Sequence, residues 1–144
     1  MPNMRRVSPL EAKQLVDQGY TYVDVRTEQE FDARHPAGAL NLPITRMGPA
    51  GPTPNAEFMT IMRRLFPLDA KIVLGCATGV RSRRAAELLS EEGYQDVVDQ
   101  RAGLDGARGP FGGIQEPGWG AAGLPVTSGA DEGSYAKIKA RAAG

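Results

Sequence analysis

The sequence contains a single cysteine, Cys76, and a single histidine, His35, among its 144 residues. One cysteine cannot form an internal disulfide, which fits a reducing compartment such as the cytoplasm. One cysteine and one histidine cannot supply a zinc site either, so we expect no bound metal. A Cys–His pair is a common way to activate a thiol. His35, however, precedes a proline in a segment that reads as structural, and we predict that it is not a catalytic base.

Net charge and long hydrophobic runs are also missing. Seventeen acidic and seventeen basic side chains cancel, so nothing indicates a nucleic-acid partner. No apolar run approaches the ~18 residues of a membrane-spanning helix. The basic segment 1–7 is not followed by the apolar core of a signal peptide. We therefore expect one cytoplasmic domain that is large enough to bury a core.

Cys76 stands where the hydrophobic pattern changes its period. Residues 72–74 form a short apolar run that is typical of a buried parallel strand. From Arg81 onward the apolar residues recur at helical spacing, and Gly93 is suited to end that helix. The residues of this helical stripe are Ala85, Leu88 and Leu89. The sequence therefore places Cys76 in a loop between a strand and a helix.

A loop that leads into a helix N-terminus is suited to an anion, because the first N–H groups of a helix have no intrahelical partner. A thiol at this place is expected to ionise below its ordinary value of about 8.5. Gly79 permits a positive φ in the loop, and Arg81 adds positive charge. A buried structural cysteine is the alternative, and it is the commoner fate of a free thiol. The position between strand and helix favours a reactive Cys76.

Residues 76–81, Cys-Ala-Thr-Gly-Val-Arg, resemble the active-site loop Cys-x-x-Gly-x-Arg of the rhodaneses, which are single-domain sulfurtransferases. Residues 24–31, 35–43 and 123–126 are similar to three further motifs of this family, and all four occur in the family's order. The resemblance covers roughly residues 7–126. It implies an α/β, rhodanese-like three-layer fold with a central, mainly parallel sheet.

Local patterns give an alternation of strands and helices that is typical of a parallel α/β sheet. Two capping boxes, Ser8 with Glu11 and Thr27 with Glu30, predict the starts of two helices. Residues 44–55 are rich in Pro and Gly and are predicted to form a loop. Strands are expected at residues 20–25, 39–42, 72–74 and 96–99, and a further helix after Asn55 up to Phe66.

Two segments depart from the family pattern. About a dozen extra residues form a predicted extra loop at about 104–118, and loops of this length are often functional. We predict that it covers Cys76 as a lid, with Phe111 or Trp119 as an apolar wall; a plain surface insertion is the alternative. Residues 1–126 are taken as the rhodanese-like domain. Residues 127–144 are expected to be a flexible tail with a short helix.

The resemblance implies that Cys76 is the catalytic residue. The loop that would bind the sulfur consists of Ala77, Thr78, Gly79, Val80, Arg81 and Ser82. Asp24 and Arg26, at the end of a neighbouring predicted strand, are expected to support this loop. A pair between Arg26 and Glu30, four residues apart on a helix, is an alternative arrangement.

The resulting hypothesis is a sulfurtransferase that moves a sulfane sulfur from thiosulfate or a persulfide to a thiol or cyanide through a Cys76 persulfide. It implies no cofactor, and partners that are a small sulfur donor, a thiol acceptor or a protein persulfide. Neither nucleic acid nor membrane is expected as a partner. The neutral Ala77 and Val80 predict poor use of the thiosulfate dianion.

Two other functions remain open. A persulfide carrier or binding module for a partner protein would use the same Cys76. A phosphatase or arsenate reductase needs five residues between Cys and Arg, whereas four separate Cys76 from Arg81.

Overall fold

The computed structural model describes residues 4–144, and a five-stranded sheet lies at its centre. The strand order is β1-β8-β7-β2-β4, and every neighbouring pair is parallel. These strands are β1 (Arg5–Val7), β2 (Thr21–Asp24), β4 (Leu40–Asn41), β7 (Lys71–Gly75) and β8 (Asp96–Gln100). The predicted parallel α/β fold is confirmed. No hydrophobic pattern indicates β1, because two of its three residues are exposed arginines.

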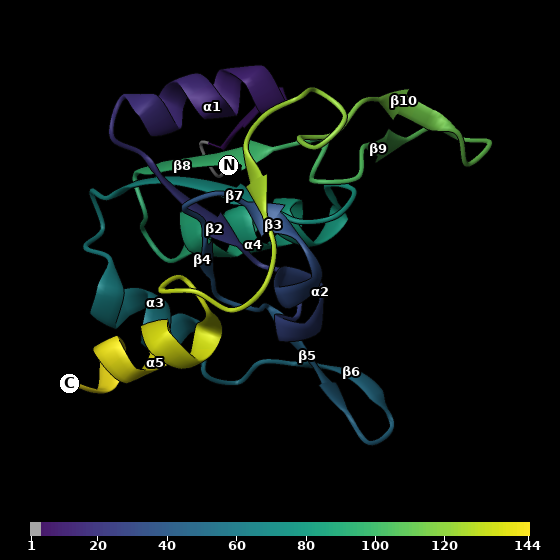
Figure 1. The fold of residues 1–144 in the computed structure, drawn as a ribbon. Helices are drawn as coiled ribbons and strands as arrows, with labels where there is room; N and C mark the ends of the chain where they lie inside the picture. Colours follow the sequence, from purple (N-terminus) through teal and green to yellow (C-terminus); the bar gives the residue numbers. More distant parts are fainter. Residues whose placement is uncertain (1–3) are drawn as a thin grey trace.

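Helices cover both faces of the sheet (Figure 1). They are α1 (Pro9–Asp17), α2 (Glu28–Ala33), α3 (Phe58–Leu65), α4 (Val80–Glu91) and α5 (Tyr135–Ala143). Figure 1 shows α1 on one side of the sheet and α3 and α5 on the other. No helix within residues 4–144 combines the length and the apolar character that crossing a membrane requires.

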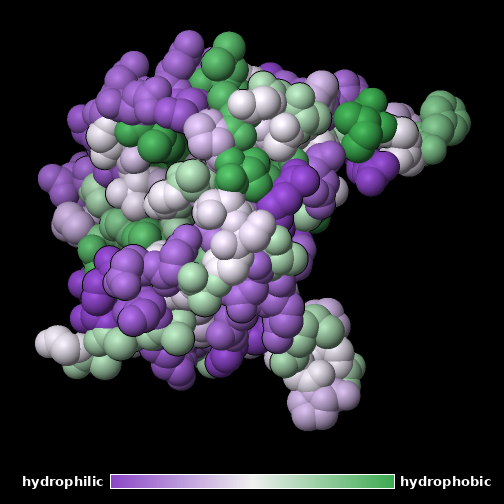
Figure 2. All heavy atoms as spheres, in the orientation of Figure 1, coloured by the Kyte–Doolittle hydropathy of each residue, from purple (hydrophilic) through white to green (hydrophobic). Residues whose placement is uncertain are grey.

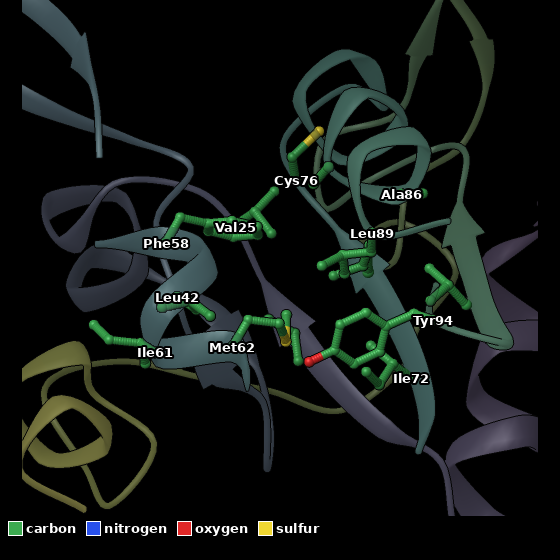
Figure 3. Packing of buried hydrophobic residues seen from close by; sticks show 14 of the residues in the cluster. Val25, Leu42, Phe58, Ile61, Met62, Ile72, Cys76, Ala86, Leu89 and Tyr94 are labelled. Atoms are coloured by element: carbon green, nitrogen blue, oxygen red, sulfur yellow. The ribbon is translucent and has the colours of Figure 1, made fainter. Parts of the chain in front are cut away.

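The alternation of side chains along the strands builds two hydrophobic cores, one on each face. Ile72 and Leu74 of β7 belong to the core that α3, α4 and α5 share. Figure 3 shows Ile72 there with Met62, Leu89 and Tyr94. Val73, between them, points to the opposite face and joins the core under α1. The middle strand is therefore buried on both sides, which explains its uninterrupted apolar sequence.

Both predicted capping boxes are present. The Ser8 hydroxyl accepts a hydrogen bond from the Glu11 N–H, and the Glu11 carboxylate accepts one from the Ser8 N–H. Thr27 and Glu30 make the same reciprocal pair at the start of α2. These caps are local in sequence, so they could be predicted without knowledge of the tertiary structure.

The prediction of a loop at 44–55 is wrong, because the chain forms an antiparallel hairpin there. Its strands are β5 (Thr45–Gly48) and β6 (Gly51–Pro54). The two strands pair only with each other, so prolines can be placed where no ladder N–H is needed. The extra segment also forms an antiparallel hairpin, whose strands are β9 (Ala107–Arg108) and β10 (Ile114–Glu116). Both hairpins project from the same side of the molecule (Figures 1 and 2).

The C-terminal segment is packed against the domain, which corrects the expectation of a flexible tail. Tyr135 and Ile138 of α5 are 2% and 1% exposed and belong to the core that α3 and α4 share. The Asn41 N–H donates to the Gly133 carbonyl over 2.7 Å. The strand β11 (Val126–Thr127) pairs with β3 (His35–Pro36). The sequence signal was weak because only two large apolar residues, three positions apart, mark the buried face of α5.

Candidate active site

The sulfur of Cys76 lies at the centre of the loop between β7 and α4. Its Sγ accepts hydrogen bonds from the N–H groups of Gly79 at 3.2 Å and Ser82 at 3.3 Å. The thiol also lies 3.4 Å from the Ser82 hydroxyl oxygen, to which it donates. Cys76 is 3% exposed, and its sulfur points away from the apolar side chains around it (Figure 3). Two converging N–H donors are suited to a negative charge on sulfur.

Gly79 cannot be replaced without moving the loop. It has a φ of +94° and precedes the first residue of α4. A Cβ at this position would lie 2.1 Å from the carbonyl oxygen of Arg101. The backbone therefore needs glycine here both for its left-handed conformation and for the close approach of the segment after β8.

A turn after β8 holds the other end of the loop. The N–H groups of Leu104 and Asp105 donate to the carbonyls of Cys76 and Ala77, each over 2.8 Å. A Cβ on Gly103 would lie 2.4 Å from the Ala77 oxygen, so the two segments are in direct backbone contact. These bonds join residues that are far apart in sequence, and no local pattern indicated them.

Arg81 is held by Glu30. Its two terminal nitrogens donate to the two carboxylate oxygens of Glu30 at 2.6 and 2.9 Å. Burial by itself would raise the pKa of Glu30, but hydrogen bonds from Arg81 and Thr27 outweigh burial and lower the pKa to about 2. The hydrogen bond to Glu30 likewise raises the pKa of Arg81 against the effect of burial. The loop arginine therefore serves as an anchor to α2, and its charge is largely balanced by Glu30.

The family model for the rhodanese-like domain matches residues 8–108, more than half of the chain. The chain belongs to the rhodanese-like family. It is 36% identical over 93 residues to Thiosulfate sulfurtransferase 16, chloroplastic, of Arabidopsis thaliana, which covers 65% of this chain and 78% of that protein. It is 31% identical over 104 residues to Thiosulfate sulfurtransferase GlpE of Haemophilus influenzae, which covers 72% of this chain and 88% of that protein.

Solved structures agree with this assignment. Rv0390 from M. tuberculosis has a TM-score of 0.71 and 26% identity, over 86% of this chain and 97% of that chain. The Alr3790 protein from Anabaena sp. has a TM-score of 0.67 at 18% identity, over 94% of this chain and 90% of that chain, and therefore shows likeness of fold alone. The predicted family is confirmed.

Asp24 and Arg26 form a buried ion pair in this rhodanese-like chain. The Arg26 side chain donates to both oxygens of Asp24 at 2.8–3.2 Å, and the two side chains are 5% and 1% exposed. Asn41 donates to the carbonyls of both residues. Within residues 4–144 neither side chain has a hydrogen bond to the loop 76–82, so the pair does not support the loop directly. The alternative pair of Arg26 with Glu30 does not form.

His35 is fully buried, and structural groups occupy both of its ring nitrogens. Nδ1 lies 2.7 Å from the Phe31 carbonyl oxygen, and Nε2 lies 2.8 Å from an Asp131 carboxylate oxygen. The ring stacks on Phe31 with centroids 3.6 Å apart. These contacts tie the C-terminal segment to α2. No group of three or more His, Cys, Asp or Glu side chains within residues 4–144 is arranged to hold a metal ion.

The extra segment does not supply the apolar wall over Cys76 that we predicted. Phe111 is fully exposed at 100%, whereas Trp119 is 2% exposed and packs edge-on against Tyr22 at 5.2 Å in the core under α1. Instead, the β9–β10 hairpin stands beside the loop and forms one wall of a pocket of about 730 Å³. The hairpin is tied to the end of β8 by the ion pair of Glu116 with Arg101 at 2.9 Å. No local pattern indicates this pair, so the extra segment could be recognised in the sequence but not placed.

Proposed function

We propose that this protein is a sulfurtransferase that carries a sulfane sulfur on Cys76 as a persulfide. The observation that supports this most is the convergence of the Gly79 and Ser82 N–H groups on the Cys76 Sγ at 3.2 and 3.3 Å. Such donors are fixed before any ligand arrives, so they stabilise a negative sulfur without a cost for reorganisation. Two relatives that are named thiosulfate sulfurtransferases support the same class of reaction.

The reaction proceeds in two displacements. In the first, the Cys76 thiolate attacks the outer sulfur of thiosulfate or of a persulfide. A new S–S bond forms, the old bond to that sulfur breaks, and sulfite or a thiolate leaves with the electron pair. In the second, an acceptor thiolate attacks the outer sulfur of the Cys76 persulfide, takes it, and releases the Cys76 thiolate. Cyanide in the same role leaves as thiocyanate.

The loop contributes backbone donors rather than free charge. Ala77 and Val80 are neutral, and Arg81 is paired with Glu30 at 2.6 Å. A persulfide carries less charge on its reacting group than the thiosulfate dianion does, so we propose that a persulfide is the better donor. Because the sulfur is carried covalently on Cys76, the cycle requires no cofactor. The single thiol must stay reduced between cycles, and we therefore place the reaction in the cytoplasm.

Mass spectrometry tests the proposal directly. The protein is incubated with thiosulfate or with glutathione persulfide, desalted and measured intact, and the modified peptide is then identified. We expect one added sulfur on the peptide with Cys76, none in Cys76→Ser, and loss of the added sulfur after cyanide treatment. An unmodified wild-type protein with both donors would contradict the proposal.

A further inference from the structure

A basic pocket opens beside the Cys76 loop. One wall is the loop and the first turn of α4, with Thr78, Gly79, Val80 and Arg83. The opposite wall is the β9–β10 hairpin of the extra segment. It contributes Ala107, Arg108, Gln115 and Glu116, and Arg6 and Arg101 complete the lining. In Figure 1 this hairpin extends away from the sheet.

Gly79 connects this pocket with the reacting sulfur. It lines the pocket and at the same time donates its N–H to the Cys76 Sγ over 3.2 Å. Thr78 lines the pocket too and is two residues from Cys76, so their Cα atoms are at most about 7.6 Å apart. Cys76 itself does not line the pocket, so the pocket borders the sulfur through the adjoining loop residues Thr78, Gly79 and Val80.

Positive charge exceeds negative charge in the lining. Arg6 is paired with Asp99 at 2.7 Å, and Arg101 with Glu116 at 2.9 Å. Neither Arg83 nor Arg108 has an ion-pair partner among residues 4–144, and Arg108 makes only a hydrogen bond to the Gly112 carbonyl. The guanidinium groups of these two arginines come from opposite walls, where each is available to a carboxylate.

The size of the pocket indicates the size of the ligand. At roughly 30 Å³ per heavy atom, the volume share of a water molecule, the five atoms of thiosulfate fill about 150 Å³. This is a small part of the pocket's volume of about 730 Å³. A tripeptide of 20 heavy atoms fills roughly 600 Å³ on the same count. Pockets of this size are typical of small organic ligands.

We propose that this pocket binds the carboxylates of a peptide-sized thiol and presents its sulfur to Cys76, with Arg83 and Arg108 as the carboxylate-binding residues. The inference rests on the proposed sulfurtransferase function. In the second displacement, the bound thiolate attacks the outer sulfur of the Cys76 persulfide. A bond from the thiol sulfur to that sulfur forms, the Cys76 S–S bond breaks, and Cys76 departs as the thiolate.

Binding is measured first, without any turnover. The probe is S-methylglutathione, which has two carboxylates and cannot accept sulfur. Its binding to the Cys76→Ser protein is measured by isothermal titration calorimetry. We expect Arg83→Gln and Arg108→Gln each to weaken binding roughly tenfold, as loss of a charge-assisted contact does. Arg84→Gln is the matched control. Arg84 follows Arg83 on α4 but lines a separate hollow with Glu87, Leu88 and Glu91, and this change should leave binding intact.

Transfer kinetics complete the test. The kcat/KM for glutathione as acceptor should fall with Arg83→Gln and Arg108→Gln, while that for mercaptoethanol, which has no carboxylate, should not. Absence of S-methylglutathione binding, or equal binding by the Arg83 and Arg84 variants, would overturn the inference. So would a rise in KM for thiosulfate alone, since the pocket would then serve the donor. Failure of Cys76 to take up sulfur at all would instead contradict the proposed function, and the two failures are thereby separable.

Discussion

At the scale of single residues, the Glu30 carboxylate joins the start of α2 to the loop that holds Cys76. The capping box identified it as the residue whose carboxylate accepts the Thr27 N–H, and it does so at 3.1 Å. The same carboxylate also holds Arg81 from a distant part of the chain. Local spacing pointed to Arg26 as the ionic partner, because residues four apart meet on a helix. Arg26 precedes the helix and is engaged by Asp24, so it is not available.

The substitution Glu30→Gln should lower the free energy of unfolding at neutral pH and remove part of the pH dependence of that free energy. The folded pKa of Glu30 is about 2, below the ordinary 4.5. The contribution of the Glu30 carboxylate to stability is therefore complete above pH 4.5 and is lost as the pH falls through about 2. We expect a difference of about 1 kcal/mol at pH 7, because the pair is only half-buried and partly screened.

Urea denaturation of wild type and Glu30→Gln between pH 7 and pH 2 measures this difference. The two free energies of unfolding should converge as the pH falls below 4.5. A difference that stays constant over this range would show that the carboxylate's charge does not contribute. Glu28→Gln is a suitable control, since Glu28 is in the same first turn but pairs with the exposed Arg46.

Gly79→Ala tests the close contact between the loop and the segment after β8. The added Cβ would lie 2.1 Å from the Arg101 oxygen, so the loop or that segment has to move. Gly112→Ala is the matched control, because Gly112 also has a positive φ but a Cβ there meets nothing within 4 Å. Backbone strain alone costs about 1–3 kcal/mol in both variants. We expect Gly79→Ala to lose more stability and to lose sulfur uptake, whereas Gly112→Ala keeps it. Equal stability and uptake in both variants would show that the contact is unimportant.

At the scale of elements, the predictions were good where the signal was local and continuous. Capping boxes and the apolar run of β7 specify α1, α2 and the central strand without reference to other parts of the chain. The hairpins β5–β6 and β9–β10 were read as loops because their glycines and prolines are turn residues. Such short strands are formed by pairing, which depends on the partner strand and not on a hydrophobic period.

The buried pair Asp24–Arg26 joins the end of β2 to the end of α2, and its loss should be costly. The Arg26 side chain donates both to the Asp24 carboxylate at the end of β2 and to the Arg34 carbonyl after α2. Asn41 of β4 donates to the main-chain carbonyls of Asp24 and Arg26, so these bonds do not depend on the ion pair. Burial alone would lower the pKa of Arg26, but the hydrogen bonds and charge of Asp24 outweigh it and raise this pKa. Arg26→Met would leave Asp24 buried without its partner, which costs about 3–5 kcal/mol.

The control for this prediction is Arg46→Met. Arg46 pairs with Glu28, and these side chains are 44% and 34% exposed, so this pair should contribute at most about 1 kcal/mol. Thermal or urea unfolding of the two variants gives the comparison. Equal losses of stability would show that burial of the Asp24–Arg26 pair has no special role.

At the scale of the whole molecule, the arrangement of the elements could not be derived from periodicity. The alternation of strands and helices predicts a parallel sheet, but the order β1-β8-β7-β2-β4 depends on which strands meet in space. The family resemblance supplied the fold class, and the place of Cys76 after the middle strand followed from local pattern. Both cores also depend on residues beyond the matched range 8–108. Trp119 completes the core under α1, and Tyr135 and Ile138 complete the core that α3 and α4 share.

This placement predicts that residues 128–144 are needed for a stable fold. Their removal exposes the core contacts of Tyr135 and Ile138, which contribute about 1.5–3 kcal/mol each. It also removes the Asp131 carboxylate from His35 and the Gly133 carbonyl from Asn41. Domains of this size have about 5–15 kcal/mol of stability in total, so the chain 1–127 should be marginally folded. Chemical denaturation and the rate of Cys76 alkylation measure this, since the sulfur of a loosened core reacts faster. The chain 1–142, which loses only the last two residues and keeps Tyr135, Ile138 and Ala142 in the core, should unfold like the full protein. If the chain 1–127 retained the midpoint and alkylation rate of the full protein, the C-terminal segment would be a dispensable tail after all.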